Sequence, residues 1–153
     1  MSYDNLLIES AKEGLIVKEA PLTSADGRLA GNRIAIRQDI DTTTEKACIL
    51  AEEIGHYHTN TMNILDQEQV VNRKLERAGR LWAYDRLVGL SGIIQGHRAG
   101  CRSSYELAEL LGVTEDFLQE ALTHYRKKYG IMTQIDRYTI IFEPSLMVIE
   151  KIK

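Results

Sequence analysis

The sequence predicts a long helix that begins near residue 42 and carries charged groups along one flank. Thr42-Thr43-Thr44-Glu45 has the form of a capping box, in which a hydroxyl and a carboxylate each satisfy a free backbone N–H at a helix start. The apolar residues that follow recur at helical spacing: Ala47, Leu50, Ala51 and Ile54. The rest of the chain is expected to pack against this stripe.

The stretch Ala51-Glu52-Glu53-Ile54-Gly55-His56-Tyr57-His58 gives this helix a candidate site. Glu52 and His56 are four residues apart, so they lie on one face and could hold a metal ion together. Glu53 lies roughly 100° round the helix, where it could act on a water molecule. This is the layout of the His-Glu-x-x-His helix of metallopeptidases, with Glu52 in place of the first histidine. The alternative is a pair of solvated carboxylates, and His56 at this spacing favours the metal site.

Two residues near His56, Gly55 and His58, lead to further predictions. A glycine costs a helix about 1 kcal/mol relative to alanine, so Gly55 indicates that some group approaches the backbone closely. His58 points roughly 200° away from His56 on a continuous helix. A capping or supporting role is therefore expected for His58, not metal ligation.

A second helix is predicted over about residues 66–88, and it places one acid on a small, apolar face. Four residues fall along one line of it: Glu76, Gly79, Ala83 and Leu87. An acid buried there without a partner would cost several kcal/mol, so Glu76 needs a metal ion or a cation. Three arginines offer the ordinary alternative: Arg73, Arg77 and Arg80. With Glu52 and His56 upstream, Glu76 is predicted to be the third metal ligand.

Leu50-Ala51-Glu52-Glu53-Ile54-Gly55-His56-Tyr57 resembles the active-site helix of the ImmA/IrrE family of metallo-endopeptidases, many of which read His-Glu-x-Gly-His here. Glu76-Arg77-Ala78-Gly79-Arg80-Leu81-Trp82-Ala83 is similar to the family's Glu-x-x-Ala-x-x-Phe/Trp-Ala, whose glutamate is a ligand. The resemblance runs from about Gly14 to the C-terminus. It implies an α+β fold in which a small β-sheet packs on a zincin-like metal-site helix, followed by further helices and a short C-terminal β segment.

The resemblance also implies a function, which is cleavage of a helix-turn-helix repressor encoded by a phage or mobile element. In the implied mechanism Glu52, His56 and Glu76 hold a divalent ion, and Glu53 is the general base. Zinc is the expected ion, although two carboxylates suit manganese or iron better than two imidazoles would. The alternatives are an antirepressor that binds its partner without cutting it and, third, a DNA-binding regulator.

The whole chain, residues 1–153, is predicted to form one domain with three parts. The metal-site core, residues 1–90, is expected to hold a helix at 3–13, strands at 15–19 and 31–37, and turns at 21–31. Residues 91–130 are expected to hold a glycine-punctuated connection at 91–100 and then a helix-turn-helix-like pair of helices. Residues 131–153 are expected to form C-terminal strands at 138–142 and 146–149.

The helix-turn-helix-like pair is not expected to bind DNA. Ser104 to Thr114 reads like the first helix and turn, but the next helix begins Thr114-Glu115-Asp116, and acids at that end repel phosphates. The net charge of −3 also opposes nucleic-acid binding. Structural packing or a surface for protein docking is the expected role of these helices.

Bulk composition sets the remaining expectations. With 44% apolar and 27% charged residues, the chain has the profile of a soluble globular protein. No apolar run approaches the roughly 20 residues of a membrane span, and the first residues lack the pattern of a signal peptide, so a cytoplasmic location without membrane attachment is expected. Cys48 and Cys101 match no paired motif and are predicted to be free thiols.

Overall fold

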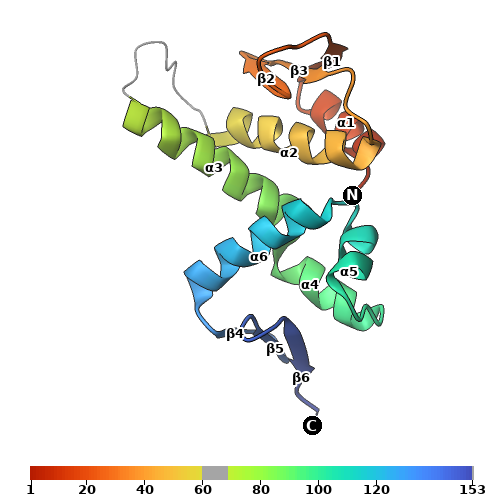
Figure 1. The fold of residues 1–153 in the computed structure, drawn as a ribbon, viewed down its shortest axis with the longest axis vertical. Helices are drawn as coiled ribbons and strands as arrows, with labels where there is room; N and C mark the ends of the chain where they lie inside the picture. Colours follow the sequence, from red (N-terminus) through yellow and green to blue (C-terminus); the bar gives the residue numbers. More distant parts are fainter. Residues whose placement is uncertain (60–68, 153) are drawn as a thin grey trace.

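The chain forms an α+β fold in which helices lie between two small three-stranded sheets (Figure 1). The structure is a computed structural model that describes residues 1–59 and 69–152. The α+β class predicted from the sequence is confirmed. In the described ranges, no helix combines the length and apolar character that crossing a membrane requires.

The N-terminal part consists of α1 (Tyr3–Lys12), β1 (Ile16–Ala20), β2 (Gly27–Ala30) and β3 (Arg33–Arg37). The strand order is β1-β3-β2, with β1 parallel and β2 antiparallel to β3. Ile34 and Ile36 are buried while Arg33 is exposed, which is the alternation expected of a half-buried strand. The predicted helix at 3–13 and strands at 15–19 and 31–37 are confirmed.

Strand β2 lies inside the segment that was expected to consist of turns, so that expectation was wrong in part. Glycine and aspartate are frequent in turns, and Gly27 follows Asp26 directly. The register of β2 against β3, from Gly27 opposite Ile36 to Ala30 opposite Arg33, holds this segment extended. Pairing with a strand further along the chain therefore overrides the local preference.

The central helix α2 (Thr43–Thr59) is covered by the first sheet on one side and by α3 on another. Thr42 Oγ1 accepts a hydrogen bond from Glu45 N at 3.1 Å, which is one half of the predicted capping box. Helix α3 (Gln69–Leu87) packs along α2. It confirms the second predicted helix, whose first positions, 66–68, lie outside the described residues.

The predicted connection at 91–100 is instead a helix, α4 (Gly89–Arg98), so this expectation was wrong. Its glycines are packing positions. A Cβ atom at Gly96 would lie 2.4 Å from Leu107 Cδ1, and one at Gly92 would lie 3.3 Å from Leu111 Cδ2. The glycines let α4 approach α5 closely. In the sequence, closely spaced glycines of this kind look the same as the glycines of a loop.

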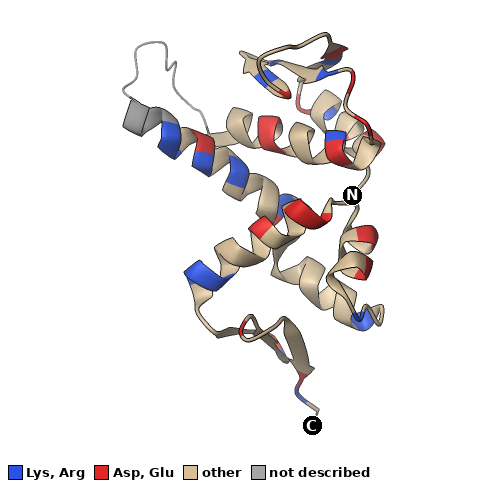
Figure 2. Ribbon diagram, viewed as in Figure 1, with Lys and Arg blue, Asp and Glu red and all other residues tan. Residues whose placement is uncertain are grey.

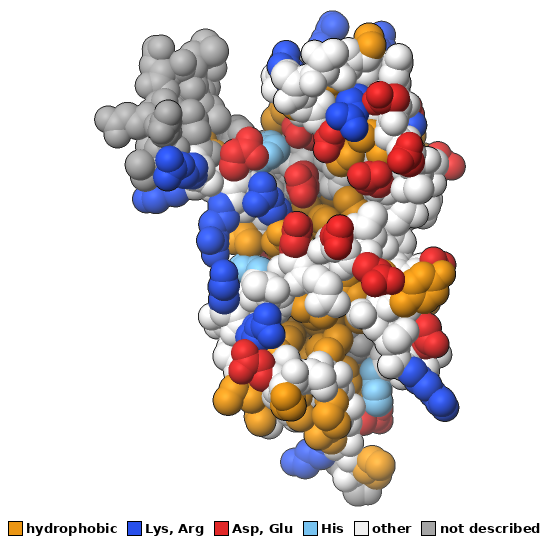
Figure 3. All heavy atoms as spheres, viewed as in Figure 1, with side chains coloured by type: hydrophobic (Ala, Val, Ile, Leu, Met, Phe, Trp, Pro, Cys, Tyr) orange, Lys and Arg blue, Asp and Glu red, His pale blue; other side chains and the backbone are white. Residues whose placement is uncertain are grey.

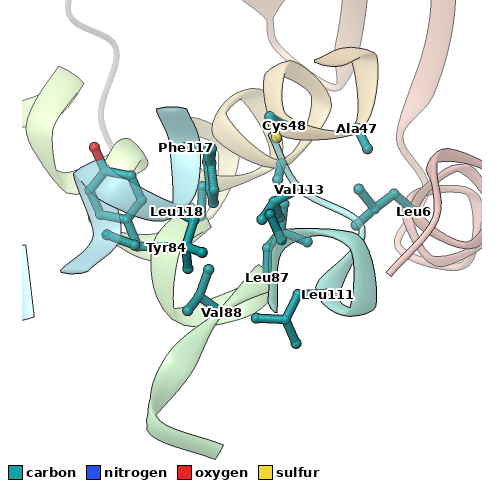
Figure 4. Packing of buried hydrophobic residues seen from close by; sticks show 14 of the residues in the cluster. Leu6, Ala47, Cys48, Tyr84, Leu87, Val88, Leu111, Val113, Phe117 and Leu118 are labelled. Carbon is teal, nitrogen blue, oxygen red and sulfur yellow. The ribbon is translucent and has the colours of Figure 1, made fainter. Parts of the chain in front are cut away.

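Helices α5 (Ser104–Leu111) and α6 (Glu115–Tyr129) confirm the predicted helical pair. Figure 4 shows the packing that joins them to α1, α2 and α3. The apolar residues labelled there come from all five helices and the turn between α5 and α6: Leu6, Ala47, Tyr84, Leu87, Leu111, Val113, Phe117 and Leu118. Cys48 is buried in the same cluster and Cys101 is half-buried, and both are free thiols as predicted.

The C-terminal sheet consists of β4 (Met132–Ile135), β5 (Tyr138–Ile141) and β6 (Met147–Glu150), paired antiparallel in that order. Strands β5 and β6 confirm the predicted C-terminal strands, whereas β4 was not anticipated. Tyr138 and Ile140 are buried toward the helices, while Met132 and Met147 are each 51% exposed on the opposite face.

Candidate functional site

The four predicted site residues lie where α2 and α3 pack against each other. Glu52, Glu53 and His56 come from α2, and Glu76 comes from α3. Figure 2 shows acidic residues on α2 beside a row of basic residues along α3, with one acid among them. The basic row consists of four exposed residues: Arg73, Lys74, Arg77 and Arg80.

Two glycines set the distance between the helices. A Cβ atom at Gly55 would lie 2.2 Å from the carbonyl oxygen of Gly79, and one at Gly79 would lie 2.3 Å from His56 Nδ1. No side chain fits at either position. The close approach predicted from Gly55 is therefore present, and the approaching group is the backbone of α3. Gly79 in turn leaves the space that the imidazole of His56 occupies.

His56 and Glu76 meet across this contact. The Nε2 atom of His56 lies 3.3 Å from Oε2 of Glu76. The His56 side chain is 9% exposed, whereas that of Glu76 is 66% exposed, so the pair reaches from the interior to solvent. Two residues expected to approach each other from separate helices are thus in contact.

Glu53 lies on the side of α2 that faces β2. A Cβ atom at Gly27 would lie 3.0 Å from Glu53 Cγ and 3.1 Å from its Oε1, so a larger residue at position 27 would crowd this side chain. Burial raises the pKa of Glu53 to about 7, and the carboxylates of Glu76 and Glu52 add to the shift. At neutral pH this group is therefore close to its point of half protonation.

Glu52 has a similarly perturbed carboxyl group. Burial raises its pKa to about 7, against an ordinary value of 4.5. The guanidinium of Arg80 opposes this shift. Three further acids add to it: Glu120, Glu76 and Asp26. Burial and the neighbouring acids therefore outweigh the opposing effect of Arg80 on the pKa of Glu52.

The residues fit a metal ion in their chemistry and only in part in their arrangement. An imidazole and several carboxylates form a donor set that zinc, manganese and iron accept. Within residues 1–59 and 69–152, however, no three His, Cys, Asp or Glu side chains are grouped so that they could hold an ion. His56 and Glu76 form a pair, and Glu52 does not join them as a third member.

His58 lies outside this group, as expected. Its Nε2 atom is 2.7 Å from Oε2 of Glu13, and its ring stacks on Trp82 with centroids 5.0 Å apart. It ties the end of α2 to the residue that follows α1 and to α3. Neither contact involves Glu52, His56 or Glu76, so the predicted capping or supporting role of His58 stays a prediction.

Two residues that shape the site come from distant parts of the sequence and were not predicted. Glu120 on α6 accepts a hydrogen bond from Tyr84 at 3.2 Å and acts on Glu52, and Gly27 on β2 makes room for Glu53. Neither stands at a recognisable spacing from the α2 motif, so no local pattern could reveal it. Arg80 was considered as a partner of Glu76, and in the structure its charge acts on Glu52.

Comparisons with protein-family models, with curated proteins and with solved structures find no match to this chain. The resemblance at the α2 and α3 motifs stays a prediction. The contact between His56 and Glu76 and the two perturbed carboxyl groups of Glu52 and Glu53 are therefore the grounds on which a function has to be argued.

Proposed function

We propose that this chain is a metal-dependent endopeptidase with its active site between α2 and α3. The observation that carries the proposal is the 3.3 Å approach of the buried His56 to Glu76, beside two carboxyl groups whose pKa values burial raises to about 7. Burial perturbs the carboxyl groups of Glu52 and Glu53, and keeping them in this position costs stability. Carboxyl groups with perturbed pKa values are frequent at functional sites.

In this proposal Glu52, His56 and Glu76 hold the ion, in a zincin-like arrangement. Residues four apart on a helix have Cβ atoms about 5–6 Å apart, so a side-chain rotation can bring Glu52 to the pair formed by His56 and Glu76. The ion, when bound, supplies a Lewis acid that polarises the scissile carbonyl and lowers the pKa of water. Zinc is the proposed ion, with manganese and iron as the alternatives that two carboxylates favour.

Glu53 is the proposed general base. A base works best when its pKa is near the operating pH, and the pKa of about 7 meets this condition. Its side chain is held between α2 and β2, where Gly27 leaves it space. From there Glu53 takes a proton from water and later delivers it to the leaving amine. The glycine contact between the helices keeps the imidazole of His56 in place.

The proposed substrate is a helix-turn-helix repressor of a phage or mobile element, met in the cytoplasm. This part of the proposal follows from the resemblance alone. The acidic start of α6, where Glu115 and Asp116 are exposed, supports a protein partner over DNA.

The direct test is cleavage of the repressor encoded beside this chain, with zinc, manganese or iron(II) added in turn. The wild-type protein should give one discrete pair of products. Glu53→Gln keeps the shape of the side chain and removes the base, so it should lower the cleavage rate by about 100-fold or more while metal binding persists. Cleavage by Glu53→Gln at the wild-type rate would contradict the role of Glu53.

A binding protein that sequesters the repressor without cutting it is the second candidate. The observation in its favour is that no three ligand side chains are grouped in the described ranges. Under this alternative the wild type and Glu53→Gln release the repressor from DNA equally well, and the repressor stays whole. Electrophoretic mobility shift of the repressor–DNA complex, followed by electrophoresis of the protein, separates the two functions.

A further inference from the structure

A second region of the molecule has the form of a small-molecule site. A cavity of about 520 Å³ lies between α4, α5, α6 and the segment from Phe142 to Val148. Its volume falls in the range of ligand sites, roughly 300–1,000 Å³. No residue that lines it comes from α2 or α3, so it is separate from the candidate peptidase site.

The inner wall of the cavity is apolar. Five aliphatic and aromatic residues contribute to it: Ile93, Leu107, Leu122, Phe142 and Leu146. Ile93, Leu107 and Phe142 belong to the buried core, so this wall is fixed by packing on its far side. Figure 3 shows hydrophobic side chains gathered on the lower half of the visible face, between α6 and the C-terminal sheet. Such a wall can take the apolar body of a ligand out of water.

The charged part of the lining is basic. Arg102, Arg126 and His97 line the cavity, whereas none of the aspartates and glutamates among the described residues does so, although the whole chain has a net charge of −3. The cavity also opens beside the N-terminus of α5, at the N-cap Ser103 and the first helical residue Ser104, where the helix dipole is positive. These features all favour a negative group in the cavity.

The two guanidinium groups are accessible to a ligand. Arg126 Nε lies 3.5 Å from Glu143 Oε1, but both side chains are more than 40% exposed, so this ion pair is weak and can be exchanged. In the described part of the chain Arg102 forms no ion pair, and the neighbouring Glu106 carboxylate accepts the backbone N–H of Arg102 at 2.7 Å. Guanidinium groups bind carboxylates and similar oxyanions through paired hydrogen bonds.

We propose that this cavity binds a small amphipathic anion. The anionic head lies at Arg102 and Arg126, and the aliphatic body lies on the wall formed by Leu107, Leu122 and Leu146. This inference goes beyond the peptidase function and does not depend on it, because the two sites share no residue.

The test uses three probes of equal length that differ in the head group: octanoate, octanol and octylamine. Each competes with the fluorescent anion anilinonaphthalene sulfonate on the full chain. Octanoate should displace the dye at a concentration about tenfold or more below that needed for octanol, and octylamine should be weakest. Octanoate should also slow the reaction of Cys101 with a thiol reagent, because Cys101 lines the cavity and the other thiol, Cys48, is buried.

Two variants locate the binding. Arg102→Gln combined with Arg126→Gln should remove the advantage of octanoate over octanol, whereas the control Arg137→Gln, an exposed arginine outside the cavity, should keep it. Leu122→Trp should fill the cavity and weaken all three probes. Equal competition by octanoate and octanol with the wild type would overturn the proposal, as would unchanged Cys101 reactivity. The wild-type series decides the matter even if a variant fails to fold.

Discussion

The site between α2 and α3 and the cavity beside α6 are opposite in charge and in construction. In the first, Glu76 pairs with His56 across a tight helix contact, and the acids Glu52 and Glu53 lie on the same helix as the histidine. The second collects Arg102 and Arg126 on the rim of an open apolar wall. In the first, burial raises the pKa values of two carboxyl groups, so the fold holds them at a cost. In the second, the charges remain in solvent.

This difference separates two kinds of function. Acids that lie beside a histidine are suited to binding a cation and moving protons, because burial raises the pKa values of Glu52 and Glu53 to about 7. An accessible basic rim on an apolar wall is suited to recognising a ligand without changing it. If the helix contact is tight and the buried carboxyl groups are unfavourable when charged, substitutions in the first region should change the free energy of unfolding.

The largest effect on stability is expected from the helix contact. Gly55→Ala places a methyl group 2.2 Å from the carbonyl oxygen of Gly79, and a backbone cannot yield as a side chain can. The free energy of unfolding should fall by about 3 kcal/mol, even though alanine favours a helix. Urea unfolding followed by circular dichroism measures this.

The matched control is Gly92→Ala, which also changes a helical glycine to alanine. Its new methyl group would meet only the side chain of Leu111, at 3.3 Å, and that side chain can move. The expected change is within about 1 kcal/mol of zero. If the two variants were equally stable, the account of the α2–α3 contact would be wrong.

The fold elements that the sequence predicted are those whose signals are local. The start of α2 is marked by the hydroxyl of Thr42, and β3 is marked by the alternation around Ile34 and Ile36. The elements it missed depend on partners far along the chain. Strand β2 is held by pairing with β3, and α4 carries glycines because Leu107 and Leu111 pack against them. Residues typical of turns wrongly indicated irregular structure in these two segments, because tertiary contacts hold them in a strand and a helix.

The same division holds for the candidate site. Spacing along the helix placed Glu52, Glu53 and His56 on α2, and the lone acid on the next helix indicated Glu76. Spacing could not reveal that Glu120 from α6 acts on Glu52, or how far burial raises the pKa values. Those properties arise only when separate elements come together.

The next effect concerns pH. The pKa of Glu52 is about 7 in the folded protein and 4.5 ordinarily, so between these values the folded state binds more protons than the unfolded state. Stability contributed by this group therefore falls as pH rises through that window. Glu52→Gln removes the buried charge and should raise the free energy of unfolding by about 2 kcal/mol at pH 8, with little change at pH 5.

Urea unfolding of the metal-free protein at both pH values checks this expectation. Glu109→Gln, a change of an exposed acid on α5, is the control and should show no such pH dependence. A destabilising effect of Glu52→Gln at pH 8 would mean that the carboxylate of Glu52 is well compensated. The contrast between the two regions would then disappear.

The smallest predicted effect concerns which metal ion the site prefers. Glu52→His restores two histidines at the spacing of the His-Glu-x-x-His helix and removes one negative charge from the site. Zinc affinity should rise by about tenfold, which is roughly 1.4 kcal/mol, while manganese affinity should not rise. Competition with a fluorescent chelator measures both affinities. Zinc affinity unchanged by the substitution would show that Glu52 is not a ligand.

Calorimetric titration of the full chain with zinc at pH 7, in two buffers of different ionisation enthalpy, shows whether the site between α2 and α3 binds a metal ion. One ion per chain should bind with a release of protons, because the ion competes with protons for the carboxyl group of Glu52, whose pKa is about 7. His56→Ala and Glu76→Gln should both lose this binding. Binding of equal strength in the wild type and in both variants, or no binding of zinc, manganese or iron(II) by the wild type, would contradict the account.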